Sequence, residues 1–183
     1  MRLKKEETFA IFVDLQERLI PAMAGSDEIV RRSVMLLEGL KALGVPSIFL
    51  RQYPKGLGDI VPELQAAAGD YTPFDKLAYS AVGDDQIKAE IERFGVQGRK
   101  NVLVCGVEGH VCVLQTCIDL TDAGFTAALV ADATGSRNAF DREIGLKRAM
   151  QEGVLLTTVE SILFELCVTA GTDEFKAISK LVR

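Results

Sequence analysis

The sequence of 183 residues has no tryptophan, one histidine, four cysteines and five prolines. It also has no apolar run that approaches the ~20 residues of a membrane-spanning helix, which argues against a membrane protein. Basic residues are in the minority, with 21 Lys and Arg against 26 Asp and Glu and a net charge of −5. Nucleic-acid-binding proteins usually present a basic face, so we expect an ordinary soluble protein that binds neither nucleic acid nor membrane.

The scarcity of histidine and cysteine limits the metal chemistry that the chain can support. A zinc site usually takes four Cys or His ligands, or three with a water, whereas here His110 stands beside cysteines that form no C-x-x-C pair. We therefore expect no metal ion. The first residues, MRLKKEETF, are charged and unlike a secretory signal, so we expect a cytoplasmic protein without a disulfide framework.

Apolar residues make up 48% and charged residues 26% of the sequence, as is typical of a globular domain with a full core. Apolar runs alternate with segments of helical periodicity, and no linker or repeat interrupts them, so residues 1–183 are expected to form one domain. The apolar runs predict strands at 8–14, 46–52, 71–75, 101–107, 125–132 and 154–157. The periodic segments predict helices from Ser26 to about 43, at 61–68, 84–94, 110–123 and 138–151, from Thr157 onward, and at 172–181.

Several of these helices carry recognisable start signals. Ser26 is placed to cap the first long helix. Thr157 and Glu160 have the spacing of a capping box, which predicts that Thr157 opens a helix. The segment 53–82 is instead rich in proline and glycine, and we expect most of it to run over the surface.

Strands that are unbroken apolar runs and alternate with helices indicate a parallel sheet with helices on both faces. The sequence therefore predicts a three-layer α/β domain. In such sheets ligands bind at the carboxyl ends of the strands, where the strand order reverses. Asp14 closes the first predicted strand and the fourth strand runs into Cys112, so these two residues are the first candidates for chemistry.

The stretch around the fourth strand, VCGVEGHVCVLQTC, holds three of the four cysteines and the histidine. Cys112 falls in the first turn of the next helix, where backbone N–H groups and the helix dipole favour a thiolate and lower its pKa. Cys105 lies in an apolar strand and Cys117 lies about 140° round the helix, so both are expected to face the core. A free cysteine is often only a small buried hydrophobe, and a strand-terminal aspartate often only caps a turn, so both interpretations stay open here.

Three motifs narrow the interpretation: IFVDLQERL near the start, FDKLAYSAV in the middle and CGVEGHVCVLQT after the fourth strand. Together with the segments QYPKGLG and VADATGSR, they resemble the isochorismatase-like cysteine hydrolase superfamily over nearly the whole chain, and most of all its isochorismatase-domain-containing branch. The resemblance implies a three-layer αβα fold with a mainly parallel six-stranded sheet in the Rossmann-like order 3-2-1-4-5-6. It also implies a catalytic triad, whose positions are filled by Asp14, Lys76 and Cys112.

The resemblance gives each member of the triad a role. Cys112 is expected to attack a carbonyl-type carbon and form a thioester acyl-enzyme. Asp14 is expected to accept the thiol proton and return it to the leaving group, while Lys76 holds both negative charges in place. The peptide bond at the position of Val107 and Glu108 is commonly cis in this family, and the N–H groups of Glu108 and Cys112 are expected to form the oxyanion hole. Without the resemblance, Lys76 would be taken for an ordinary solvated lysine.

The sequence departs from other branches of the superfamily. One histidine cannot reproduce the aspartate and two histidines with which nicotinamidases bind a metal, and Cys112 points away from the vinyl-ether cleavage that gives the superfamily its name. We therefore expect hydrolysis of a small amide or carbamoyl substrate without an organic cofactor, since neither G-x-G-x-x-G nor a P-loop occurs. The candidate pocket residues, chosen by position only, are Gln16, Gln52, Tyr53, Tyr79 and His110.

Other interpretations remain open at this point. His110 could equally be a helix-start residue that bonds to backbone. One rival function is a magnesium-dependent phosphatase with Asp14 as nucleophile, although Gln16 stands where that chemistry favours a second carboxylate. The other rival is a catalytically silent binding or scaffold protein that retains the fold. Superfamily members are usually dimers or tetramers, which predicts a homo-oligomer, with the apolar segments ILFELCV and FKAISKLV as candidates for its interface.

Overall fold

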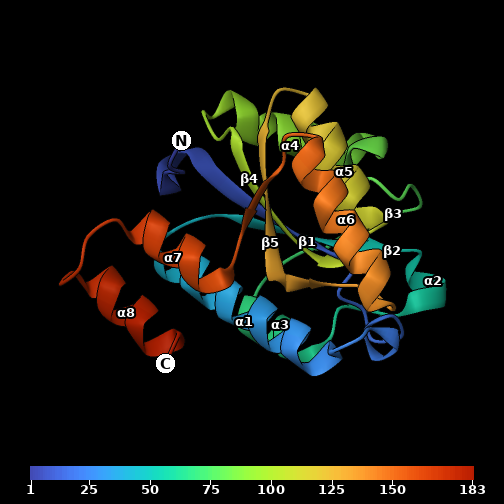
Figure 1. Cartoon of the computed structure of the whole chain (residues 1–183), viewed down its shortest axis with the longest axis horizontal. Coiled ribbons are helices and arrows are strands. Elements are labelled where there is room, and N and C mark those ends of the chain that lie inside the picture. The colour runs from blue at the N-terminus through green and yellow to red at the C-terminus, as the bar shows by residue number, and fades with distance from the viewer.

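A six-stranded sheet with helices on both faces forms the centre of the computed structural model, which describes all of residues 1–183 (Figure 1). Every neighbouring pair of strands is parallel, and the order is β3-β2-β1-β4-β5-β6, which confirms the predicted fold class and strand order. The strands are β1 (Thr8–Val13), β2 (Ser47–Gln52), β3 (Phe74–Lys76), β4 (Asn101–Val107), β5 (Thr126–Gly135) and β6 (Leu155–Thr157).

Eight α-helices and three 3-10 turns connect the strands. The helices are α1 (Ser26–Ala42), α2 (Pro54–Leu57), α3 (Pro62–Ala68), α4 (Asp85–Val96), α5 (Cys112–Asp122), α6 (Ala139–Gln151), α7 (Val159–Cys167) and α8 (Asp173–Leu181). The 3-10 turns are η1 (Lys5–Glu7), η2 (Ile20–Ala22) and η3 (Ala81–Gly83). None of the helices has the length and apolar character that a membrane crossing requires.

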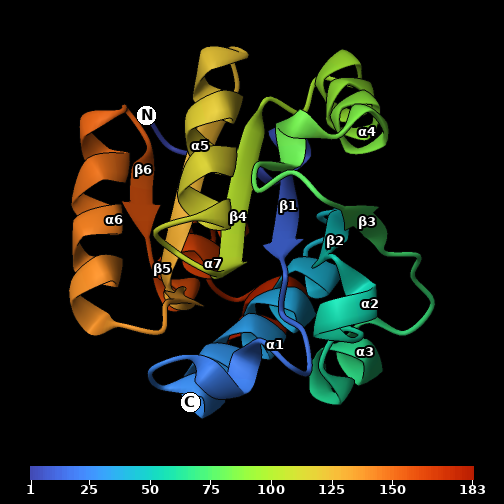
Figure 2. The ribbon, with the colours of Figure 1, turned by 90° about the vertical axis from the view of Figure 1, so that its right-hand side faces the viewer.

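Two apolar cores form because the sheet is covered on both sides. Helices α1, α3, α7 and α8 lie on one face, and α4, α5 and α6 lie on the other (Figures 1 and 2). The central strand β1 serves both cores: Ala10 and Phe12 belong to the first, whereas Phe9, Ile11 and Val13 belong to the second. Since successive side chains of a strand point to opposite faces, a strand between two helical layers must be apolar throughout, as β1 is.

The predicted elements differ from the observed ones mainly at their ends. The prediction that Ser26 caps α1 is wrong, because Gly25 occupies the cap in a left-handed conformation (φ 74°) and Ser26 is already helical. Thr157 does not cap α7 either, because it pairs with Val130 in the sheet; Thr158 takes that role and accepts from the N–H of Ser161. The short helix α2, within the predicted surface segment, was not anticipated.

Candidate active site

The fold brings Asp14, Lys76 and Cys112 together at the carboxyl edge of the sheet. Asp14 directly follows β1 with a positive φ of 52°, and its N–H donates to the carbonyl of Leu50 in β2. Lys76 is the last residue of β3, and Cys112 is the first residue of α5, after β4. Because β1, β3 and β4 run in parallel, their carboxyl ends meet at one edge, which Figure 2 shows with the arrowheads of β1 and β4 side by side.

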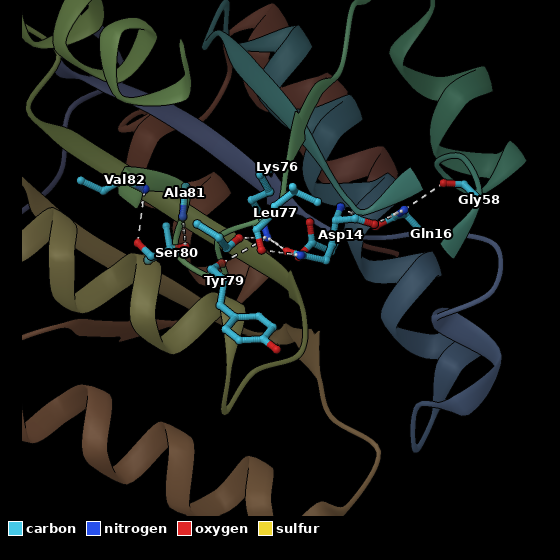
Figure 3. A network of polar contacts seen from close by, with 12 residues as sticks. Asp14, Gln16, Gly58, Lys76, Leu77, Tyr79, Ser80, Ala81 and Val82 are labelled. Atoms are coloured by element: carbon cyan, nitrogen blue, oxygen red, sulfur yellow. Dashed lines mark hydrogen bonds and ion pairs between the residues drawn. The ribbon is translucent and has the colours of Figure 1, made fainter. Parts of the chain in front are cut away.

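Lys76 and Asp14 form a buried ion pair. Lys76 Nζ lies 2.7 Å from Asp14 Oδ2, and neither side chain has any exposed surface. The ammonium also donates to Gln52 Oε1 at 2.6 Å and to the carbonyl of Tyr79 at 3.1 Å (Figure 3). A buried charge is tolerated only when its hydrogen bonds are satisfied, so these acceptors explain why a lysine can lie inside the protein. Asp14 Oδ1, by contrast, is buried and makes no hydrogen bond.

The thiol of Cys112 is almost fully enclosed, with 6% of the residue exposed. Burial, and next the negative charge of Asp14, raise the pKa of Cys112 to about 12, although Lys76 and the backbone N–H of Glu108 act in the opposite direction. The expectation that the start of α5 lowers this pKa is therefore wrong. The physical reason is that loss of hydration outweighs the field of the helix terminus.

Asp14 is affected by the same enclosure. Burial raises the pKa of Asp14 above its ordinary value, and the charge and hydrogen bond of Lys76 counteract this without cancelling it. A carboxylate with a raised pKa is a stronger proton acceptor than an exposed one. At rest the thiol of Cys112 is thus protonated and lies beside the buried Asp14–Lys76 pair.

The loop between β4 and α5 wraps the start of the helix. The peptide bond between Val107 and Glu108 is cis. The carbonyl of Glu108 accepts from the N–H groups of Val111 and Val113, while the N–H of Cys112 donates to no protein oxygen. The Glu108 side chain is held by Arg137, whose Nε lies 2.9 Å from Glu108 Oε2. The N–H groups of Glu108 and Cys112 are therefore placed beside the sulfur.

The two glutamines proposed for the pocket have their amides bound inside the protein. Gln16 is fully buried, and its Nε2 donates to the carbonyls of Gln52 and Gly58 at 3.0 and 2.8 Å, while its Oε1 accepts from the N–H of Gln52. Gln52 accepts from Lys76 and donates to the carbonyl of Leu77 at 2.9 Å. These contacts occupy both donors of the Gln16 amide and one of the two donors of the Gln52 amide, so both glutamines brace the ion pair.

The other three predicted pocket residues lie farther out. Tyr53 and Tyr79 are 52% and 57% exposed, on the segments that follow β2 and β3. His110 is half-buried, and its Nδ1 is hydrogen-bonded to Ser136 Oγ at 3.0 Å. This contact is with a side chain and differs from the backbone contact that the sequence left open for His110.

The largest cavities lie apart from the three residues of the triad, and no cluster of metal ligands is present. The two largest cavities, of about 430 and 420 Å³, lie between η2, α1 and α3 and between α4 and α5, and neither is lined by Asp14, Lys76 or Cys112. All four cysteines are free and buried, and no group of three or more Cys, His, Asp or Glu side chains is close enough to hold a metal.

Two partners at the site were missed from the sequence. The sequence predicts Gln52 as a substrate contact, whereas Gln52 holds Lys76, and it gives no sign of Arg137, which holds Glu108. A signal for the first existed, because Gln52 closes β2 and lies in register with Lys76 of β3. The second depends on how the β5–α6 loop folds back, for which no pattern in the sequence gives a sign.

Comparison with known sequences places the site in a family context. Residues 8–161 match the isochorismatase domain. A secreted isochorismatase effector of Phytophthora sojae is 36% identical, over 100% of this chain and 87% of that protein. Isochorismatase domain-containing protein 1 of Danio rerio is 38% identical over 93% of this chain, but the chain spans only 59% of that protein.

Solved structures agree with the sequence relationships. A protein described as MAR1 ribonuclease from Caenorhabditis elegans has a TM-score of 0.91 and 33% identity, over 100% of this chain and 92% of that one. The YcaC gene product of Escherichia coli, described as an octameric hydrolase of unknown specificity, has a TM-score of 0.91 at 24% identity, over 99% and 89% of the two chains, and shows likeness of fold alone. The chain belongs to the isochorismatase-domain family and has the isochorismatase-like α/β fold.

Proposed function

We propose that this protein hydrolyses a small amide or carbamoyl compound through a thioester on Cys112, with Asp14 as proton carrier and Lys76 as the charge that holds Asp14. The observation that carries the proposal is the fully buried Lys76–Asp14 pair, 2.7 Å long, beside a nucleophile at the start of a helix. A buried ion pair is a costly structure, so its position next to a thiol favours a catalytic role over a purely structural one.

The first half of the proposed reaction is acylation. The sulfur of Cys112 forms a bond to the carbonyl carbon as its proton passes to Asp14, because a thiol with a pKa of about 12 needs a base at the moment of attack. The N–H groups of Glu108 and Cys112 receive the negative charge that develops on the carbonyl oxygen. The carbon–nitrogen bond then breaks, Asp14 returns the proton to nitrogen, and an amine leaves.

The second half is hydrolysis of the thioester. A water molecule gives one proton to Asp14 and forms the new carbon–oxygen bond. The carbon–sulfur bond breaks, the proton returns to sulfur, and an acid leaves, so that thiol and carboxylate are restored. Lys76 exchanges no proton in this scheme; its hydrogen bond to Oδ2 holds the carboxylate in place and leaves Oδ1 as the oxygen that accepts the proton.

Other functions find less support. A scaffold protein would have no need of a buried lysine and aspartate beside a thiol. A magnesium-dependent phosphatase with Asp14 as nucleophile favours a second carboxylate two residues on, where this chain has Gln16. The ribonuclease description of the Caenorhabditis elegans relative is not extended to this chain, because a net charge of −5 gives RNA little to bind.

The oligomeric state and the cellular location of the protein are proposed only in general terms. The Escherichia coli relative is described as octameric, which supports a homo-oligomer without fixing a dimer or tetramer. One relative is described as a secreted effector, so a cytoplasmic location for this chain remains a prediction from its sequence.

The proposal is tested by trapping the acyl-enzyme. The protein is mixed with a library of small amides and carbamoyl compounds, quenched in acid, and analysed by peptide mass spectrometry for a mass increase on Cys112. Cys112→Ala should abolish both adduct and hydrolysis, whereas Cys117→Ala, a buried cysteine one helical turn farther on, should retain both. Hydrolysis that persists in Cys112→Ala would contradict the mechanism. A folded protein that forms no adduct with any compound would favour the scaffold alternative.

A further inference from the structure

The reacting end of any substrate must enter an enclosed place. Cys112 is 6% exposed, and the side chains of Lys76 and Asp14 have no exposed surface. An ionised group that enters such a place loses hydration and is stabilised only if the protein supplies an unpaired charge of opposite sign. The charge that a substrate can carry near its scissile bond therefore depends on which cations are free at this edge of the sheet.

Lys76, the cation of the site itself, has no N–H bond left for a substrate. An ammonium group has three N–H bonds, and those of Lys76 are directed to Asp14 Oδ2, Gln52 Oε1 and the carbonyl of Tyr79, at 2.7, 2.6 and 3.1 Å. The unpartnered group is Asp14 Oδ1, which is an acceptor. Within the pair, the site thus presents one acceptor oxygen without a partner and no unused N–H bond of the ammonium.

Of the arginines near the carboxyl ends of the strands, Arg51 and Arg137 are paired with carboxylates, whereas Arg18 and Arg142 donate only to backbone carbonyls. Each donates to oxygen atoms of the protein: Arg18 to Gly56, Arg51 to Asp59 and Asp75, Arg137 to Glu108, and Arg142 to Ala131 and Thr134. Lys55 on α2 is the exception, because it is exposed and makes no ion pair or hydrogen bond through its ammonium. It lies outside the buried pair, on a helix that covers the end of β2 (Figure 2).

We infer, on the basis of the proposed function, that the substrate is uncharged on the atoms next to its scissile carbonyl: a neutral amide or carbamoyl compound without a carboxylate there. A carboxylate in that position would meet the unpartnered oxygen of Asp14, while Lys76, the cation that contacts Asp14, has its three N–H bonds directed to other acceptors. The pKa of Cys112 agrees with this, since the charge of Asp14 raises that pKa more than the charge of Lys76 lowers it. The N–H groups of Glu108 and Cys112 do not offset this, because the carbonyl oxygen needs them as it becomes negative.

The inference is tested with iodoacetamide and iodoacetate, which have nearly the same size and differ in charge. In both reagents the sulfur displaces iodide from the carbon next to the amide or carboxylate. The rate at Cys112 is measured by peptide mass spectrometry at ~pH 9.5, and each rate is divided by that for 2-mercaptoethanol, a neutral thiol. Because both reagents consume the same thiolate, the ratio of the two normalised rates does not depend on the pKa of Cys112.

We expect the normalised rate for iodoacetamide to exceed that for iodoacetate by about 30-fold or more. A ratio near one, with both reagents reacting, would overturn the inference and leave the nucleophile in place. Failure of both reagents to label Cys112 would overturn the proposed function and the inference with it. In Lys55→Ala the ratio should stay within about twofold of the unaltered protein; a strong rise would identify Lys55 as a cation that admits anions, and would overturn the inference.

Discussion

Replacement of Asp14 by asparagine should make Cys112 easier to alkylate while it abolishes hydrolysis. With a pKa of about 12, the thiol is ionised at pH 8 in only about one molecule in 10,000, against about one in four for an ordinary cysteine of pKa ~8.5. Cys112 of the unaltered protein should therefore react with iodoacetamide about 2,500-fold more slowly than a free thiol. The negative charge of Asp14 is the second cause of this pKa, after burial. Its removal should lower the pKa by about one unit or more, which accelerates labelling at least about tenfold.

The assay is peptide mass spectrometry of iodoacetamide-labelled protein over a range of pH. Asp75→Asn is the matched control, because it removes the same charge from an exposed position beside Lys76, where Asp75 pairs with Arg51. Loss of one partner from a buried pair costs about 3–5 kcal/mol, so circular dichroism must show that Asp14→Asn is folded. The reasoning is refuted if Cys112 of the unaltered protein labels as fast as a free thiol near neutral pH, or if Asp14→Asn slows the labelling.

Three further outcomes are expected. Gln52→Met should reduce kcat by roughly 10- to 100-fold with little change in KM, because Gln52 positions Lys76 and does not contact substrate; a change in KM alone would contradict this. The pH profile of hydrolysis should fall on the acid side through a value above 3.8, since burial raises the pKa of Asp14 and only its ionised form accepts a proton; a limb at 3.8 or below would be evidence against Asp14 as the base. Gly106→Ala should destabilise the protein by on the order of 4 kcal/mol or more in thermal unfolding, because its Cβ would lie 2.0 Å from the carbonyl oxygen of Val13 at a φ of 116°. Gly98→Ala, with a φ of 86° and no atom within 4 Å, should cost only about 1–2 kcal/mol, and equal losses for the two would contradict the steric explanation.

The fold was accessible from the sequence because its signals are local and repeated. Unbroken apolar runs at β1 and β4 require burial on both faces, and this alone selects a parallel sheet between two helical layers. The strand order was implied by the resemblance. The errors at Thr157 and Ser26 have a different origin, because helix caps are decided by one residue, and sheet pairing or a glycine turn can shift them.

The candidate site was only partly accessible. The strand-end rule pointed to Asp14 and Cys112 without any knowledge of relatives. Lys76 was found by resemblance alone, because a lysine in a polar segment gives no sign that it will be buried. The sequence predicts a lowered pKa for Cys112 because the start of a helix can be recognised in a sequence. The depth of burial cannot be recognised there, and burial is the main cause that raises this pKa.

A closed ring of hydrogen bonds explains how Lys76 can be buried. Gln16 holds both the N–H and the carbonyl of Gln52, Gln52 holds Lys76, and Lys76 holds Asp14, which lies two residues before Gln16 in the chain. Each contact joins segments far apart in sequence, so no local pattern could reveal it. These contacts give each N–H bond of the Lys76 ammonium an acceptor and leave one oxygen of Asp14 without a hydrogen-bond partner. An unsatisfied buried carboxylate oxygen is costly, and its position beside Cys112 is where a proton acceptor would be needed. The atom that lowers the stability of the fold, Asp14 Oδ1, is therefore also the atom proposed to accept the proton.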